Sequence, residues 1–173
     1  SFWCLCLYDV DWILFVKIIN NFLPLDLFKG IQTTLQSSDI AWFFKPHQTA
    51  EKKDHGFFCH TFFYNNKMLS IYHESIILPI LDKLKAKATF EARANMIINM
   101  NKPNVSDYHV DKDFECKTAI LYMNNTNAGT EIKGKTTVPE MENKLLLMDS
   151  NTPHRSVWQT NKDRRIIINI NYL

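Results

Sequence analysis

The sequence predicts a mainly β protein in which two antiparallel sheets face each other, as in a jelly roll, with helices flanking the sheets. Eight short segments after residue 90 have the composition of strands and are separated by turns, a pattern typical of sandwiches and barrels. Aromatic residues make up 13% of the chain, which favours a β-rich core. Two segments among the first 90 residues instead carry apolar side chains at helical spacing.

The size and composition indicate one globular domain. A chain of 173 residues is long enough for a full hydrophobic core. We expect residues 1–90 to supply strands and supporting helices, and residues 91–173 to form the jelly-roll core. The net charge of +2 implies no strong electrostatic attraction to nucleic acids or membranes.

The first half is predicted to alternate between strands and helices, with boundaries marked by Pro and polar residues. The expected elements are a strand at 13–19, a helix at 24–35, an extended segment at 42–44, a strand at 57–64 and a second helix at 70–87. Pro79 lies inside the second helical pattern, so the helix either kinks there or begins near it. Polar residues 47–56 are expected to form a solvated loop, with a lid over a site as the alternative.

The second half is predicted to consist of short strands. They are expected at 93–100, 108–110, 116–123, 130–132, 136–138, 144–148, 155–159 and 165–172. Only 4 Gly are present, so we expect the tight turns to rely on Asn, Asp and Pro.

The cysteines and the N-terminal segment indicate a cytoplasmic protein, of the cell or of a host cell. The spacing of the cysteines matches neither a zinc motif nor a secreted disulfide framework, so we expect reduced, mostly buried thiols at Cys4, Cys6, Cys59 and Cys116. Residues 2–16 are apolar but include Asp9 and Asp11. We therefore expect neither a signal peptide nor a membrane helix there.

Two histidines and one aspartate are the candidate metal ligands. His109 and Asp111 are two positions apart, so on a strand their side chains point to the same face. A turn at 150–153 then leads into His154, on a later strand that folds back beside the first. Two imidazoles and a carboxylate are the ligand set of a non-haem Fe(II) site with open coordination positions. The alternatives are a histidine pair without metal and a zinc site; His60 and His73 lack a suitably spaced carboxylate and are expected to be structural.

From about residue 92 to 173 the chain resembles the Fe(II)- and 2-oxoglutarate-dependent oxygenases, especially their small prolyl-hydroxylase-like members from bacteria and phages. The likeness rests on the order of His109-x-Asp111, His154 and a final strand of sequence RIIININYL. It implies a double-stranded β-helix, or cupin-like jelly roll, as the core. It also implies Fe(II) as the metal of His109, Asp111 and His154, with 2-oxoglutarate and O2 as co-substrates. Residues 1–90 match such enzymes in outline only.

The resemblance also implies contacts to 2-oxoglutarate. Family members bind its far carboxylate through a basic residue on the strand that follows the second histidine. Arg165 is favoured over Arg164, because Arg165 is followed by six mostly apolar residues and an aromatic one, as in the family. Its planar guanidinium can bind a carboxylate through two parallel hydrogen bonds. Further contacts are expected from Tyr122, Thr118 and Asn99.

One local departure from the family pattern follows the Tyr122 strand. Relatives often have a Gly-Gly pair there, whereas this chain has Ala128-Gly129. The shape of this turn can therefore differ, while the metal ligands are unaffected.

The resemblance implies an enzyme that hydroxylates a substrate C–H bond, such as that of a prolyl side chain in a protein, and releases succinate and CO2. The alternatives are an oxygenase of a small molecule or free amino acid, a nucleobase oxygenase, and a non-catalytic jelly roll holding zinc or no metal. A carboxylate-binding arginine beside the metal disfavours the last of these, and the lack of a basic stripe with aromatics disfavours nucleic acid. No membrane partner is expected, and neither the substrate nor the oligomeric state can be read from the sequence.

Overall fold

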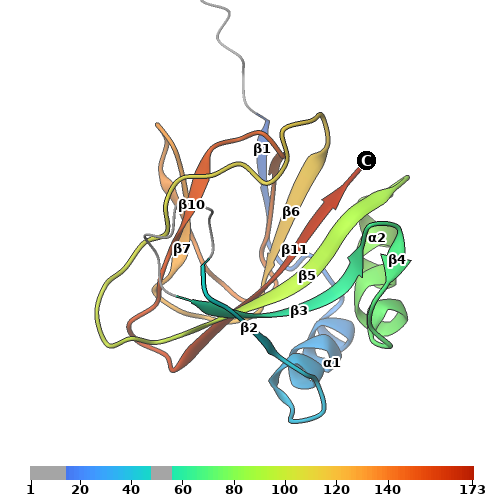
Figure 1. Cartoon of the computed structure of the whole chain (residues 1–173), viewed down its shortest axis with the longest axis horizontal. Helices are drawn as coiled ribbons and strands as arrows, with labels where there is room; N and C mark the ends of the chain where they lie inside the picture. The colour runs from blue at the N-terminus through green and yellow to red at the C-terminus, as the bar shows by residue number, and fades with distance from the viewer. Residues whose placement is uncertain (1–14, 48–55) are drawn as a thin grey trace, which may run out of the picture.

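A computed structural model describes residues 15–47 and 56–173 of the chain, which form two β-sheets and two helices (Figure 1). The larger sheet contains β1 (Val16–Ile19), β2 (Phe43–Lys45), β3 (Phe57–Tyr64), β4 (Lys67–Met68), β5 (Thr89–Ile98), β6 (Lys117–Tyr122), β9 (Leu145–Asp149) and β11 (Arg164–Tyr172). The smaller sheet contains β7 (Gly129–Ile132), β8 (Thr137–Pro139) and β10 (His154–Val157).

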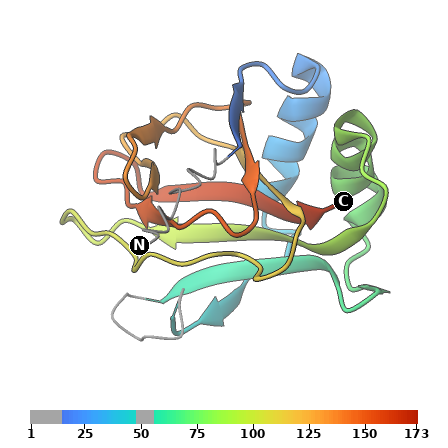
Figure 2. The same ribbon diagram turned by 90° about the horizontal axis from the view of Figure 1, so that it is seen from above.

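Strands from both halves of the sequence share the larger sheet. Its order is β1-β9-β6-β11-β5-β3-β2, with β4 paired to β3, and all of its pairs are antiparallel. The long strands β3, β5 and β11 run side by side (Figure 2). The order of the smaller sheet is β10-β7-β8. The predicted mainly β, jelly-roll architecture with flanking helices is confirmed.

The central strands of the larger sheet have one apolar face and one mixed face. On β11, Ile166, Ile168 and Ile170 belong to the core cluster that includes Phe28 and Leu35 of α1 (Leu25–Gln36). The alternate residues of the same strands point toward the smaller sheet, because side chains along a strand alternate between its faces. Ile120 of β6, for example, packs in a separate cluster with residues of β7 and β8.

The predicted helix at 24–35 is confirmed. For the second helix, the predicted extent of 70–87 is wrong, and the alternative that it begins near Pro79 is confirmed. The chain first forms a π-helical turn, His73–Ile77, and then α2 (Leu78–Leu84). Pro79 lies in the first turn of α2, where its missing N–H leaves no helical hydrogen bond unmade. Lys85 adopts a left-handed conformation with φ of 55° and ends the helix there.

One predicted strand, at 108–110, is also wrong. This segment makes a single β-bridge, His109 with His154, and is otherwise irregular. Just after the bridge, Asp111 N donates to Ser150 O, which belongs to no strand. The pairing with β10 therefore does not continue as a regular ladder. The remaining predicted strands are present, with ends that differ by a few residues.

Asparagine takes the place of glycine in the turns, as the composition predicts. Most of the described non-glycine residues with positive φ are asparagines, namely Asn21, Asn65, Asn66, Asn101 and Asn143. Asparagine tolerates this left-handed region better than most residues do.

Two predictions fall partly outside the described residues. Cys59 and Cys116 are free and buried, as expected, whereas Cys4 and Cys6 lie outside the described residues. Most of the predicted 47–56 loop also lies outside them. None of the helices in residues 15–47 and 56–173 is long and apolar enough to cross a membrane.

Removing the Phe28 side chain tests the packing of α1 on the sheet. Phe28 is fully buried in the core cluster, so Phe28→Ala should lower the free energy of unfolding by about 3–5 kcal/mol. Leu25 on the same helix is 64% exposed, and Leu25→Ala should change it by less than about 0.5 kcal/mol. Urea denaturation of both variants measures the difference. Equal effects would show that α1 does not pack against the sheet through Phe28.

Candidate metal centre and adjoining cavity

A reciprocal pair of backbone hydrogen bonds places the two histidines side by side. His109 N donates to His154 O at 2.9 Å, and His154 N donates to His109 O at 3.0 Å. His154 begins β10, and its ring centroid lies 4.6 Å from that of His109. As predicted, His154 comes from a later strand that lies beside His109.

The side chains of His109, Asp111 and His154 converge. Asp111 Oδ1 lies 3.8 Å from His109 Nε2 and 3.7 Å from His154 Nε2. One potential ligand atom from each residue lies within 4.8 Å of the others. Among the described residues no other group of three His, Cys, Asp or Glu side chains comes together in this way.

The other ring nitrogen of each imidazole, Nδ1, is hydrogen-bonded to a backbone carbonyl oxygen. His154 Nδ1 lies 2.9 Å from Thr152 O, and His109 Nδ1 lies 3.2 Å from Asp107 O. A carbonyl accepts only from a protonated nitrogen, so Nδ1 carries the hydrogen in the neutral ring. The Nε2 lone pairs then point toward Asp111, in the tautomer that a metal requires.

Three side chains hold Asp111 in place through its other oxygen. Asp111 Oδ2 accepts hydrogen bonds from Thr118 Oγ1 at 3.1 Å, Asn169 Nδ2 at 3.1 Å and Asn171 Nδ2 at 3.2 Å. Asn171 also donates to Thr118 Oγ1. Oδ1 is thereby left facing the histidines. Thr118, predicted to contact 2-oxoglutarate, donates here to a candidate metal ligand.

The electrostatics of the cluster favour the carboxylate form of Asp111 and the neutral form of His109. Burial alone raises the pKa of Asp111, but His154, Arg93 and the Asn169 hydrogen bond more than compensate, so its pKa lies below the ordinary value. Burial lowers the pKa of His109, and His154 lowers it further. At neutral pH Asp111 and His109 are therefore already deprotonated, as metal ligands must be.

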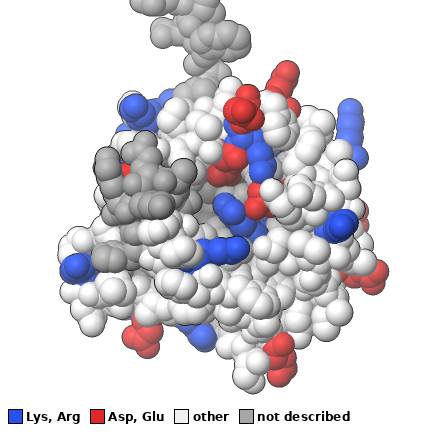
Figure 3. Space-filling model, viewed as in Figure 1, with Lys and Arg blue, Asp and Glu red and all other residues white. Residues whose placement is uncertain are grey.

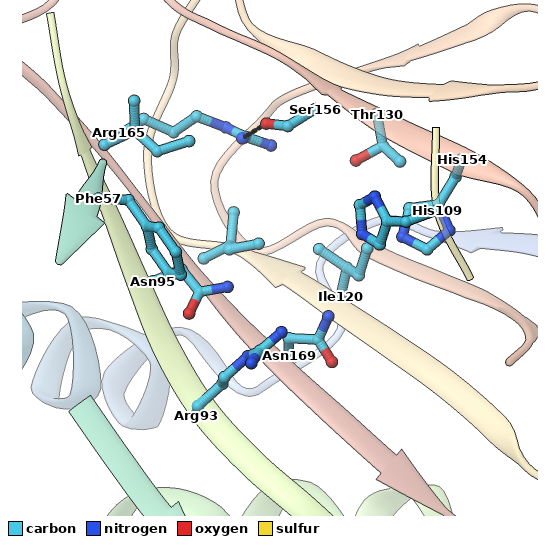
Figure 4. Close-up of a pocket in the computed structure, with 12 residues that line it drawn as sticks. Phe57, Arg93, Asn95, His109, Ile120, Thr130, His154, Ser156, Arg165 and Asn169 are labelled. Atoms are coloured by element: carbon cyan, nitrogen blue, oxygen red, sulfur yellow. Dashed lines mark hydrogen bonds between the residues drawn. The ribbon is translucent and has the colours of Figure 1, made fainter. Parts of the chain in front are cut away.

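A narrow cavity of about 50 Å³ lies beside the histidines, between the two sheets (Figure 4). His109 and His154 line one end, and Arg165 approaches from the other (Figure 4). Arg165 belongs to the inward face of β11, whereas Arg164 is exposed on the opposite face and contacts Gln36 O.

Arg165 is a buried cation with several partners. It is only 2% exposed, and its Nε donates to Glu140 Oε2 at 2.7 Å. Its Nη1 donates to Ser156 Oγ, and its Nη2 lies 3.5 Å from Gly129 O. The ion pair with Glu140 explains how an arginine can be buried at this position, since an unpaired charge there would be strongly unfavourable.

Tyr122 and Asn99 do not line this cavity. Tyr122 is fully buried, which raises its pKa to about 12, and its hydroxyl donates to Thr130 Oγ1 at 2.8 Å. Thr130 lines the cavity. Tyr122 therefore affects the cavity only indirectly, by orienting the Thr130 hydroxyl. Asn99 Nδ2 donates to Thr160 O in a surface turn, and the asparagine of β5 that lines the cavity is Asn95.

The sequence analysis does not identify several residues of this site. For two of them, Asn169 and Asn171, the sequence contains a pattern that points to the site. Asn169 and Asn171 interrupt an isoleucine-rich strand in phase with Arg165, so polar side chains on that face required buried partners. Thr130, Ser156 and Glu140 come from short strands or their ends, and nothing in their local sequence marks them.

The fold is shared with solved structures of known activity, although neither a protein-family model nor a curated protein sequence matches the chain. It is the fold of the 2-oxoglutarate- and Fe(II)-dependent oxygenases. A Burkholderia pseudomallei oxidoreductase described as a member of the 2OG-Fe(II) oxygenase family aligns with a TM-score of 0.66 and 9% identity, over 91% of this chain and 84% of that one.

Two prolyl hydroxylases have the same fold. A prolyl-4-hydroxylase of Pseudomonas putida aligns with a TM-score of 0.65 and 12% identity, over 91% of both chains. A Trichoplax adhaerens prolyl hydroxylase, in complex with a peptide fragment of the hypoxia-inducible factor oxygen degradation domain, aligns at 0.57 and 17% identity, over 91% of this chain and 83% of that one.

The hydrogen bonds to Asp111 give a direct test of the candidate metal centre. Asn171→Leu removes one donor to Asp111 while keeping a similar volume, and should weaken Mn(II) binding by about 10–100-fold. Calorimetric titration of Mn(II) into the metal-free protein measures this. Asn20→Leu, at an exposed position, is the control and should bind Mn(II) like the wild type. Unchanged affinity in a folded Asn171→Leu protein would contradict the assignment.

Proposed function

We propose that this chain is an Fe(II)- and 2-oxoglutarate-dependent dioxygenase that acts as a single domain and hydroxylates a substrate C–H bond. One observation carries the proposal: His109, Asp111 and His154 converge at one end of a cavity whose other end is a buried arginine. A zinc-binding or purely structural jelly roll explains the ion pair of Arg165 with Glu140 but gives no role to its remaining N–H donors beside the cavity.

The residues fit an iron ion. Two imidazole nitrogens and one carboxylate oxygen are presented on one side, and their second polar atoms are already bound by the protein. This donor set is the one that non-haem Fe(II) oxygenases use, with open positions for other ligands. His109, Asp111 and His154 would hold the metal.

The opposite end of the cavity fits the far carboxylate of 2-oxoglutarate. A guanidinium has five N–H donors, and the described acceptors Glu140, Ser156 and Gly129 use three of those of Arg165. Two donors are therefore left for a ligand. Thr130 accepts from Tyr122, which leaves its own hydroxyl hydrogen free to donate into the cavity.

The protein's contribution would be to bind, orient and exclude water. Arg165 and Thr130 would fix one end of 2-oxoglutarate, while the apolar side chains of Ile120 and Ile167 line the cavity between the two ends. When bound, Fe(II) with O2 supplies the oxidative chemistry, in which 2-oxoglutarate yields succinate and CO2 and the substrate gains a hydroxyl. Asp111, held by three hydrogen-bond donors, would keep the metal ion in one position.

A protein side chain such as proline is the proposed substrate. Prolyl hydroxylases share the fold, and one of them was solved with a peptide bound. An oxygenase of a small molecule or free amino acid is the alternative. We infer no nucleic-acid partner, and a cytoplasmic location stays a prediction from the sequence.

Binding of 2-oxoglutarate should require the metal. Anaerobic calorimetry should detect 2-oxoglutarate binding to the Mn(II)-loaded protein and little or none to the metal-free protein, because the metal supplies part of the binding site. With Fe(II) and O2 the protein should release succinate, and His109→Ala should abolish this release. Binding that is the same with and without metal, or succinate release by His109→Ala, would refute the proposal.

Matched variants of the two adjacent arginines test which of them binds 2-oxoglutarate. Arg165→Gln should raise the 2-oxoglutarate dissociation constant of the Mn(II) protein by at least about tenfold, the effect of losing a charge-assisted hydrogen bond. Arg164→Gln, on the opposite face of β11, should leave it unchanged. The reverse order would assign the carboxylate to Arg164. A thermal melt of each variant checks that the loss is not due to unfolding.

A further inference from the structure

A groove opens beside the metal cavity and shares two residues with it. The groove has a volume of about 510 Å³, and Phe57 and Arg93 line both it and the cavity. It is thus contiguous with the site and far larger than the cavity. Lys and Arg side chains, with Asp and Glu side chains among them, border a hollow near the centre of this face of the molecule (Figure 3).

Arg93 lies where the cavity meets the groove, with part of its hydrogen-bonding capacity unused. It is on the inward face of β5, directly across from Asn169 of β11, and both side chains point toward the same space (Figure 4). Nη1 donates to Glu91 Oε1 at 3.1 Å. Its buried Nε has no hydrogen-bond partner among residues 15–47 and 56–173.

A second buried polar atom beside Arg93 is also unsatisfied. Asn95 follows two positions later on the same face of β5 and lines the cavity. Its buried Oδ1 accepts no hydrogen bond from the described part of the chain. Leaving buried donors and acceptors unpaired is unfavourable, so an unused donor on Arg93 and an unused acceptor on Asn95 together point to a polar ligand.

The groove side chains leave excess positive charge for that ligand. Glu91 is the one acidic residue among the described groove-lining residues, and it pairs with both Arg93 and Lys112, at 3.1 and 2.7 Å. One carboxylate between two cations leaves a net charge of +1. Lys45 also lines the groove and adds a further positive charge.

We propose that the substrate carries a carboxylate and that Arg93 binds it at the junction of cavity and groove, with Asn95 accepting a hydrogen bond from a neighbouring N–H or O–H of the substrate. This rests on the proposed function and specifies its substrate class. A guanidinium binds a carboxylate through two parallel hydrogen bonds, which would set the distance from the carboxylate to the reacting C–H bond.

The two arginines of the cavity differ in a way that suits two different ligands. Arg165 is 2% exposed, at the closed end of the cavity, and is neutralised by Glu140. The Arg93 side chain is 31% exposed and faces the open groove. A small co-substrate fits the first position, whereas a larger molecule can reach only the second.

Matched acid and amide probes test the proposal on the Mn(II)- and 2-oxoglutarate-loaded protein. The small probes are the α-amides of N-acetyl-glutamate and N-acetyl-glutamine, which differ only in the side-chain carboxylate. The peptide probes are acetyl-Ala-Pro-Asp-Ala-amide and its Asn counterpart. Paramagnetic broadening of the probe NMR signals by Mn(II) reports binding near the metal. Each acid should bind at least about tenfold more tightly than its amide. A preference shown by the small acid alone, or by the peptide alone, identifies which source supplies the carboxylate, and either supports the proposal.

Variants separate Arg93 from general electrostatics. Arg93→Gln should remove the preference for acids, Arg93→Lys should keep part of it, and Arg164→Gln should keep all of it. Equal binding of acids and amides by the wild type would overturn the proposal. So would loss of 2-oxoglutarate binding in Arg93→Gln, because Arg93 would then be the co-substrate anchor.

The same measurements keep this proposal distinct from the proposed function. Binding of 2-oxoglutarate to the wild type is measured first and judges the proposed function alone. If it is absent, the acid and amide probes are compared on the Mn(II) protein without 2-oxoglutarate. A preference for acids that depends on Arg93 would still support the carboxylate site, and no preference would overturn it.

Discussion

The alternation of side chains along β5, β6 and β11 is the constraint on which the site depends. One face of these strands is dry and packs on the helices, through residues such as Ile168 and Ala119. The other face must then present every second residue to the space between the sheets. Arg93, Thr118 and Asn169 all lie on that face, so the packing of the core and the placement of the polar site are two results of one register. A shift of one residue on any of these strands would exchange the two faces.

Burying so many polar groups is stable only because most of them satisfy one another. Asp111 receives three hydrogen bonds on one oxygen, and Arg165 shares a buried ion pair with Glu140. An isolated charge in either place would be strongly destabilising. Among the buried polar atoms without a partner in the described residues, Arg93 Nε and Asn95 Oδ1 belong to residues that line the cavity, whereas others, such as Thr152 Oγ1 and Gln159 Oε1, do not. At the cavity itself, these two groups keep hydrogen-bonding capacity that a ligand can use.

The segment that carries His109 is irregular, yet it is held at several points. The Tyr108 ring lies under the guanidinium of Arg155, 4.6 Å from its centroid, and its hydroxyl donates to Glu131. Ser106 N donates to Ser156 O on the same strand that begins with His154. These contacts to the smaller sheet compensate for the missing strand ladder, so His109 is fixed relative to His154 without belonging to a regular strand.

The sequence by itself predicted the mainly β fold class and brought forward His109, Asp111 and His154 as candidate ligands, and the structure confirms the fold class and brings these three side chains together. Local spacing accounts for the strands and for the shared face of His109 and Asp111, because strand periodicity decides which side chains share a face. The preference for Arg165 over Arg164 as the co-substrate contact came from the resemblance to the oxygenases and stays a prediction. The sequence did not reveal Glu140 as the partner of Arg165, Thr130 between Tyr122 and the cavity, or the role of Thr118. Each of these contacts joins different strands or the ends of strands, and such pairs form only when the sheets stack. Only the tertiary structure could decide them, because a hydrogen bond depends on distances between segments that the order of residues does not specify.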